Sequence, residues 1–152
     1  MNSALSSIER LEVECACQRL SYEYLRALDG NDWDGVANCF AEQGVLARPM
    51  QPEQLLEGRE AIRASMKGRP KGLMTRHLAT NVMIDVISQD SATGVTTLAM
   101  IGCTPTQDAK PPFESDGPLY FGEFRDRFVR EAVNLGVRVD EEIQRSPALR
   151  GS

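Results

Sequence analysis

The chain has 152 residues, of which 41% are hydrophobic and 26% are charged, as in an ordinary globular protein. Its formal net charge of −5 argues against a nucleic-acid partner, because neutralising phosphates requires a basic face. No apolar run approaches the roughly 20 residues that span a bilayer, and the N-terminus lacks the basic and apolar parts of a signal peptide. We therefore expect one cytoplasmic domain over 1–152, with its core at about 8–144, a frayed tail at 145–152 and no membrane partner.

The four cysteines are Cys15, Cys17, Cys39 and Cys103. Cys15 and Cys17 lie two apart in a predicted helix, so they face different sides and do not chelate one metal together. Without a secretory signal, disulfides are not expected. We predict four reduced, mostly buried thiols. One histidine and scattered carboxylates give no metal-ligand spacing, and no glycine-rich phosphate loop is present, so we expect neither a metal nor a cofactor.

Residues 8–28 have the periodicity of a long first helix. One apolar stripe at helical spacing comprises Val13, Cys17, Leu20, Tyr24 and Leu28. A second stripe comprises Ile8, Leu11, Cys15 and Tyr22. A helix that is apolar on two sides is expected to pack against more than one element. Asp29-Gly30 ends the helix, since Gly takes the left-handed conformation that terminates helices.

Three short elements are expected next. Asn31 or Asp32 caps a second helix, in which apolar residues recur from Trp33 to Phe40. Residues 44–48 predict a short strand, and a further extended piece surrounds residues 55–56. Residues 58–66 predict a third helix, which Gly68 and Pro70 stop.

A long strand is predicted from Met74 to Val86, and it contains the only histidine, His77. Strict alternation places His77, Ala79, Asn81 and Met83 on one face. The other face then comprises Leu78, Thr80, Val82, Ile84 and Val86, which is suited to burial. The first face mixes a titratable ring and an amide with apolar neighbours, as the lining of a pocket would.

Further strands are predicted at 93–101, 119–130 and 137–143, with turns at 89–91 and 134–136. The third of these long strands places Tyr120, Phe124 and Phe128 on one face, with Asp126 among them. Residues 105–118 contain four prolines and predict an irregular loop, either a lid or a floppy connection. Helices followed by antiparallel strands define an α+β domain, a curved sheet wrapped around about three helices.

Five segments in this order resemble one family, the SnoaL-like branch of the nuclear transport factor 2-like superfamily. The segments are 24–34, Phe40, Gly58-Arg59-Glu60-Ala61-Ile62, Arg76-His77-Leu78-Ala79-Thr80-Asn81 and 121–130. The resemblance covers residues 8–143 and implies a cone of bent antiparallel sheet with about three helices. Its members include polyketide cyclases, scytalone dehydratase-like enzymes, ketosteroid isomerases and non-catalytic subunits, so the fold alone does not fix a function.

The resemblance to the bile-acid 7α-dehydratase-like members of this branch is narrower. It implies a Tyr and an Asp five residues apart at the end of the first helix and a His on the first long strand. Tyr24, Asp29 and His77 occupy those positions. The dehydratases also use an acid on the following strand, where this chain has only residues 97–100, Thr-Leu-Ala-Met. That departure leaves the specific reaction open.

Each of the three residues has a structural alternative. Histidine titrates near neutrality and serves as an acid or a base, but a lone histidine is more often a bonded core residue. Asp29 is either a turn residue before Gly30 or a carboxylate that orients His77 as an acid–base dyad. Tyr24 is either a member of the apolar stripe or a phenol that donates to a carbonyl or a leaving hydroxyl.

The expected substrate-binding residues lie around this constellation. They are Trp33, Phe40, Met74, Asn81, Met83, Tyr120, Phe124 and Asp126. The apolar members are equally well explained as core, and Asp126 as the partner of a neighbouring Arg.

Two hypotheses follow. The first is a cofactor-independent lyase or isomerase, dehydratase- or cyclase-like, that acts on a small hydrophobic ring-containing carbonyl compound with His77, Asp29 and Tyr24 as catalytic residues. The second is a non-catalytic binding or assembly module of the same fold. In either case we expect a homodimer formed through the outer face of the sheet, because an exposed apolar sheet face of this size is rare on monomers.

Overall fold

The computed structural model describes residues 5–48, 51–115, 117 and 119–131. The elements in chain order are α1 (Ser7–Asp29), α2 (Trp33–Asn38), β1 (Val45–Arg48), β2 (Gln51–Glu57), α3 (Arg59–Lys67), β3 (Met74–Ser88), β4 (Ser91–Cys103) and β5 (Tyr120–Val129). The predicted α+β class is confirmed, and each predicted helix and strand up to residue 130 is present. The turn at 134–136, the strand at 137–143 and the tail at 145–152 lie outside the described residues.

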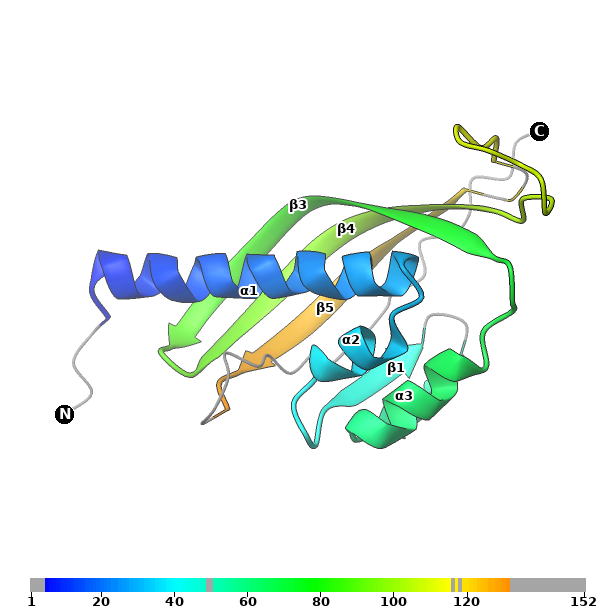
Figure 1. Ribbon diagram of the computed structural model, residues 1–152. Helices are drawn as coiled ribbons and strands as arrows, with labels where there is room; N and C mark the ends of the chain where they lie inside the picture. Colours follow the sequence, from blue (N-terminus) through cyan, green and yellow to red (C-terminus); the bar gives the residue numbers. More distant parts are fainter. Residues whose placement is uncertain (1–4, 49–50, 116, 118, 132–152) are drawn as a thin grey trace.

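The described residues form two antiparallel sheets, which organise the fold. β3, β4 and β5 form a three-stranded sheet in that order, and β1 pairs with β2. Figure 1 shows the three long strands bending as they pass behind α1, while α2, β1 and α3 gather near the C-terminal end of that helix. The inner face of the sheet is thus the face that α1 covers. No helix among the described residues is long and apolar enough to cross a membrane.

Helix α1 is fixed at its start by a capping box. The Ser6 hydroxyl accepts from the Glu9 backbone N–H at 3.2 Å, and the Glu9 carboxylate accepts from the Ser6 N–H at 2.8 Å. At its end Gly30 keeps a right-handed conformation, φ −86°, and Asn31 takes the positive φ of 56° instead. The expected left-handed Gly30 is therefore wrong. Asparagine also tolerates this conformation, because its short side chain bonds locally.

Only one of the two apolar stripes of α1 is buried. Val13, Cys17, Leu20, Tyr24 and Leu28 are all less than 9% exposed. The second stripe lies on the surface, with Ile8 70% and Leu11 56% exposed. Among the described residues α1 packs against more than one element, as expected, because it contacts β3, β4 and α2. The second apolar stripe takes no part in this packing and meets solvent.

A bulge in β3 reverses the predicted faces of that strand beyond residue 81 and leaves them as predicted before it. Thr80 pairs with Thr97 and Met83 with Val95, so two residues of β3 stand opposite one of β4. Asn81 is the bulged residue, with φ 50°. Because the extra residue shifts the alternation by one, the side chains that turn toward α1 are odd-numbered before the bulge and even-numbered after it. They are Thr75, His77, Ala79, Val82, Ile84 and Val86.

The predicted pocket positions of Asn81 and Met83 are therefore wrong. Asn81 is exposed and Met83 is 66% exposed, on the outer face beside Leu78, which is 53% exposed. Ile84 and Val86 were expected on the outer face, and instead they pack against the core. Strict alternation predicts the wrong face wherever a strand gains a residue, since each single-residue shift exchanges the two faces.

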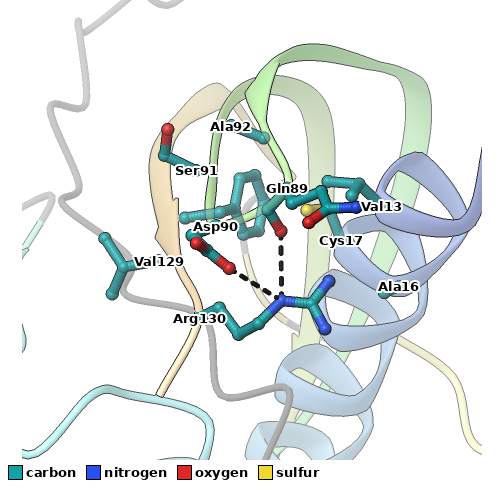
Figure 2. A pocket seen from close by; sticks show the side chains of 10 residues that line it. Val13, Ala16, Cys17, Gln89, Asp90, Ser91, Ala92, Val129 and Arg130 are labelled. Carbon is teal, nitrogen blue, oxygen red and sulfur yellow. Dashed lines mark hydrogen bonds and ion pairs between the residues drawn. The ribbon is translucent and has the colours of Figure 1, made fainter. Parts of the chain in front are cut away.

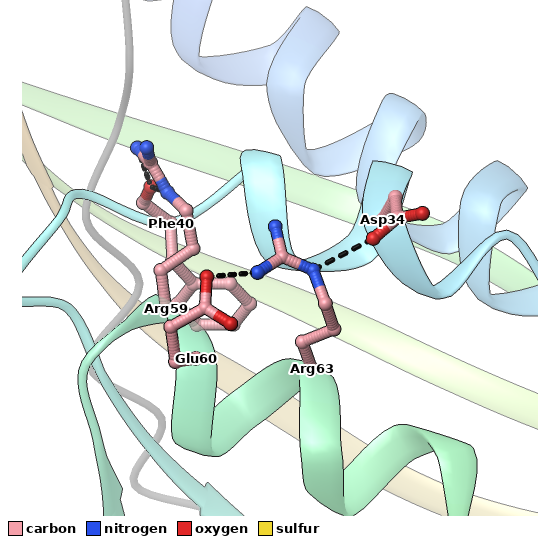
Figure 3. Close-up of polar contacts among 5 residues, drawn as sticks. All are labelled: Asp34, Phe40, Arg59, Glu60 and Arg63. Carbon is pink, nitrogen blue, oxygen red and sulfur yellow. Dashed lines mark hydrogen bonds and ion pairs between the residues drawn. The ribbon is translucent and has the colours of Figure 1, made fainter.

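Helix α3 is held against the core by its first arginine. Arg59 donates from Nε and Nη2 to the backbone carbonyl of the fully buried Phe40, at 3.0 and 2.5 Å. Arg63 also bridges to Asp34 of α2 at 2.7 Å and to Glu60 (Figure 3). The preceding Gly58 has φ 83°, a conformation that favours glycine. The Gly58-to-Ile62 motif thus anchors a helix.

The bulge predicts a specific response to substitution at Asn81. Replacement by Val should lower the free energy of unfolding by roughly 1–3 kcal/mol, because a β-branched residue is strained at positive φ. Asn81→Gly should be near neutral, since glycine adopts the same conformation freely. Urea unfolding followed by circular dichroism measures both. Equal stability of the Val and Gly variants would contradict the bulge.

Candidate functional site

Asp29 and His77 form a hydrogen-bonded pair between the end of α1 and the start of β3. His77 Nδ1 lies 2.5 Å from Asp29 Oδ1, and the His77 backbone N–H donates to Asp29 Oδ2 at 2.8 Å. The two side chains are 7% and 15% exposed. The structure therefore brings together the two residues on which the predicted site depends, although they lie 48 positions apart in the chain.

The pair has a defined electrostatic state. Burial alone would raise the pKa of Asp29, but hydrogen bonds from the His77 ring and backbone, the His77 charge and the Thr75 hydroxyl outweigh it and lower that pKa. Asp29 is thus a carboxylate at neutral pH and only accepts hydrogen bonds. Nδ1 of His77 must therefore carry the proton of this contact. In the neutral ring, Nε2 then holds the free lone pair.

Asp29 occupies a position that a helix by itself disfavours. It is the last residue of α1, where the negative end of the helix dipole destabilises a carboxylate by a few tenths of a kcal/mol or more. The donors of β3 offset this cost, since hydrogen bonds to a charged group contribute about 1.5–3 kcal/mol each. The Asp29–β3 contact consequently ties the C-terminal end of α1 to the sheet.

Tyr24 lies one turn and a half before Asp29, with its ring in the core. It is 5% exposed and contacts two aromatic rings edge-on, Phe40 at 5.7 Å and Phe124 at 5.9 Å between centroids. These T-shaped contacts hold the phenol rigidly. The Tyr24 and Asp29 side chains would converge more easily if Asp29 lay past the last regular turn of α1. Both residues instead lie within α1.

The strand register places two further side chains beside His77. His77 pairs with Met100 of β4, and Met100 pairs with Tyr120 of β5, so the three share one row of the inner face. Tyr120 is 48% exposed, at the open end of that row. Met100 stands directly opposite His77, where the residue pattern of the related dehydratases led us to look for an acid. Sequence alone does not give this register.

Thr75 is a site residue that the sequence analysis missed. Its hydroxyl donates to Asp29 Oδ1 at 3.0 Å, and the residue is 4% exposed. A signal was available, because residues two apart on a strand share a face and Thr75 precedes His77 by two.

The other predicted wall residues are distributed over the core. Phe40 and Phe124 surround Tyr24, whereas Met74 begins β3 and pairs with Cys103. Trp33 packs at the core edge under the guanidinium of Arg69, 5.6 Å from the ring centroid. The place of Trp33 in a binding site stays a prediction.

Asp126 lies on the inner face but far from His77. It pairs with Gly94, six positions along β4 from Met100, which corresponds to roughly 20 Å of strand. A Cβ on Gly94 would meet Ile84 and Phe128 side chains at 2.8 Å, so this part of the interior is closely packed. Asp126 was expected to pair with an arginine, but it forms no such ion pair among the described residues. Its Oδ1 has no hydrogen-bond partner among them either.

Burial raises the pKa of Asp126 to about 7. The residue is 5% exposed, and without a cation beside it the charged form is poorly solvated. Asp126 is therefore a largely neutral acid below pH 7, in contrast to the ionised Asp29.

A shallow surface recess lies against the N-terminal half of α1, away from Asp29. Val13, Cys17 and Phe128 form part of its wall, and Arg130 closes one side by donating from Nε to the Gln89 carbonyl at 3.0 Å (Figure 2). None of the predicted site residues lines it. The hydrogen-bonded pair, and not this recess, is the basis of the candidate site.

The described residues hold no group of three His, Cys, Asp or Glu side chains arranged to bind a metal. All four cysteines are free; Cys17 and Cys39 are buried, and burial raises the pKa of each thiol to about 11. Cys15 is exposed and Cys103 half-buried, so fewer thiols are buried than expected. A raised pKa leaves Cys17 and Cys39 as unreactive thiols at neutral pH.

Comparison with known proteins defines the class. A family profile described as the SnoaL-like domain matches residues 9–140. The chain therefore belongs to the SnoaL-like domain family, as the sequence motifs indicated. No match was found among curated proteins.

Solved structures agree on the fold. A Novosphingobium aromaticivorans protein provisionally named a scytalone dehydratase superposes with a TM-score of 0.71 at 20% identity, covering 88% of this chain and 83% of that one. A second protein of that organism, described as nuclear transport factor 2-like with a cystatin-like fold, gives 0.65 at 20% identity, with 87% and 80% coverage. ActVI-ORFA of Streptomyces coelicolor gives 0.63 at 19% identity, with 82% and 90% coverage. The nuclear transport factor 2-like fold is thereby confirmed.

The raised pKa of Asp126 predicts a pH-dependent stability. An unfolded aspartate titrates near 3.9, so between that pH and about 7 the folded chain binds a proton that the unfolded chain does not. The free energy of unfolding must therefore fall as pH rises through this window. Between pH 5 and pH 8, the free energy of unfolding of Asp126→Asn should rise by roughly 2–3 kcal/mol relative to that of the wild type.

Urea unfolding at the two pH values measures this gain. Asp85→Asn is the matched control, because Asp85 is exposed and its replacement should leave the pH dependence unchanged. Parallel pH profiles for Asp126→Asn and the wild type would show that Asp126 is not a buried neutral acid.

Proposed function

We propose that the chain is a cofactor-independent lyase or isomerase, dehydratase- or cyclase-like, that acts by acid–base chemistry on a small hydrophobic ring-containing carbonyl compound. The observation that carries the proposal is the Asp29–His77 pair, with Nδ1 to Oδ1 at 2.5 Å and both side chains largely shielded from water. Membership of the SnoaL-like family supports it at the level of reaction class.

His77 is the proposed general base. With Nδ1–H committed to the carboxylate, Nε2 is the nitrogen available to take a proton from the carbon beside the substrate carbonyl. Asp29 fixes this tautomer and stabilises the imidazolium that forms after the transfer. The same Nε2–H then returns the proton, to another carbon in an isomerisation or to a departing hydroxyl in a dehydration.

Tyr24 is the proposed hydrogen-bond donor. A rigid phenol in a shielded interior stabilises the oxyanion that develops on the carbonyl, because its dipole needs no reorganisation. The apolar side chains of Met100 and Tyr120 beside His77 are the proposed walls for the substrate ring. A ring compound suits them, since aromatic and thioether groups contact flat apolar surfaces well.

Variants of the pair test the proposal. On a panel of cyclic ketones and β-hydroxy ketones, proton exchange with deuterated water and loss of the hydroxyl are followed by NMR. His77→Ala and Asp29→Asn should each lower the rate roughly 100-fold or more, since a positioned general base contributes that much. Asp85→Asn, an exposed change on the same strand, should leave it unaltered. Wild-type rates in both site variants would refute the dyad.

A second candidate function is a non-catalytic assembly module, and the outer face of the sheet favours it. Leu78, Ala99 and Phe121 form one apolar row across the three strands, with Phe121 65% exposed. Met83 is exposed on the same face. We propose a homodimer through this outer face, as first expected, with Leu78 on it but with Ile84 and Val86 turned toward the core.

Light scattering tests the dimer. The wild type should give twice the chain mass of 16.8 kDa, and Phe121→Glu should shift it to the monomer by burying a charge in the interface. Ile8→Glu is the control, because Ile8 is 70% exposed but lies on α1. A wild-type mass of 16.8 kDa would exclude the dimer.

A further inference from the structure

The Asp29 carboxylate is held by β3 at both of its oxygens. Oδ2 accepts the His77 backbone N–H at 2.8 Å, and Oδ1 accepts the Thr75 hydroxyl at 3.0 Å in addition to His77 Nδ1 at 2.5 Å. Only the ring contact belongs to the catalytic pair itself. The other two donors decide how the carboxylate plane is oriented toward the imidazole.

Thr75 is suited to this task by its place on the strand. It precedes His77 by two residues, so both side chains turn toward α1, and the bulge at Asn81 lies beyond them. Its 4% exposure excludes most competition from water for the hydroxyl. An ionised carboxylate only accepts, so the Thr75 hydroxyl donates its single hydrogen to Oδ1.

We propose that Thr75 is the positioning residue of this site: its hydroxyl orients Asp29 so that His77 keeps its proton on Nδ1 and presents the lone pair of Nε2. Without the hydroxyl, the carboxylate keeps one backbone anchor and rotates about its Cβ–Cγ bond. Oδ1 then no longer faces Nδ1 in a fixed geometry, and the ring populates the other tautomer. The last step, use of Nε2 on a substrate, rests on the proposed function, whereas the tautomer does not.

Thr75→Val removes the hydroxyl and keeps the shape of the side chain, and Thr75→Ser keeps the hydroxyl. The matched control is Thr96→Val. Thr96 is 1% exposed on the neighbouring strand, and its Oγ1 has no hydrogen-bond partner among the described residues. Both Val variants therefore delete a buried threonine hydroxyl, but only one deletes a bond to Asp29.

The chain has one histidine, so ¹⁵N NMR reports a single imidazole. At alkaline pH, where the ring is neutral, the wild type, Thr75→Ser and Thr96→Val should show the Nδ1–H tautomer. In Thr75→Val the tautomer ratio should shift toward Nε2–H by roughly fivefold, the effect of losing one hydrogen bond of ordinary strength. ¹³C NMR should show the pKa of Asp29 rising in this variant alone, since the Thr75 bond helps to lower it.

An unchanged tautomer ratio and an unchanged Asp29 titration in Thr75→Val would overturn the proposal. So would equal shifts in Thr75→Val and Thr96→Val, which would assign the effect to core packing. If Thr75→Val does not fold, Thr75→Cys replaces it, and its weak donor should give a smaller shift in the same direction. The spectra need no substrate, so an inactive chain would refute the proposed function and leave this inference standing.

Discussion

The site depends on the three hydrogen bonds that the Asp29 carboxylate accepts from β3. They join the last residue of α1 to the first residues of β3 and determine where the helix end lies relative to the sheet. The same bonds keep the carboxylate ionised at the unfavourable end of a helix dipole. The Asp29 carboxylate therefore has a structural and a chemical role, because the hydrogen bonds that hold the helix end also give His77 a defined tautomer.

The bulge at Asn81 is the second constraint, and it acts on the whole sheet. A regular strand would place His77 and Ile84 on opposite faces, since they are seven residues apart. One extra residue lets β3 turn His77 toward α1 at one end and the apolar Ile84 and Val86 toward the same helix further along. The strand thus contributes a polar site and a hydrophobic core to a single face. The outer face receives Met83 as a consequence, beside Leu78, which precedes the bulge and faces outward without it.

Two aspartates, the half-buried Asp29 and the buried Asp126, show how the environment sets the role of a side chain. Asp29 has three donors and a low pKa, whereas Asp126 has an unpartnered oxygen and a pKa raised to about 7. The two side chains are chemically identical, and both were predicted from the sequence to be site residues. Only Asp29 contacts His77, and the register places Asp126 roughly 20 Å of strand away. Proximity to a donor, and not residue type, separates the base-orienting carboxylate from the neutral acid.

The sequence by itself determined the helices and strands up to residue 130, the two apolar stripes of α1 and the family, because periodicity and local motifs are encoded by neighbouring residues. It also named Asp29 and His77. The tertiary structure decided which face of β3 is buried, the isolation of Asp126 and the contribution of Thr75. A bulge, a strand register and a hydrogen bond across 46 positions are properties of the packed chain, since each depends on residues that only folding brings together.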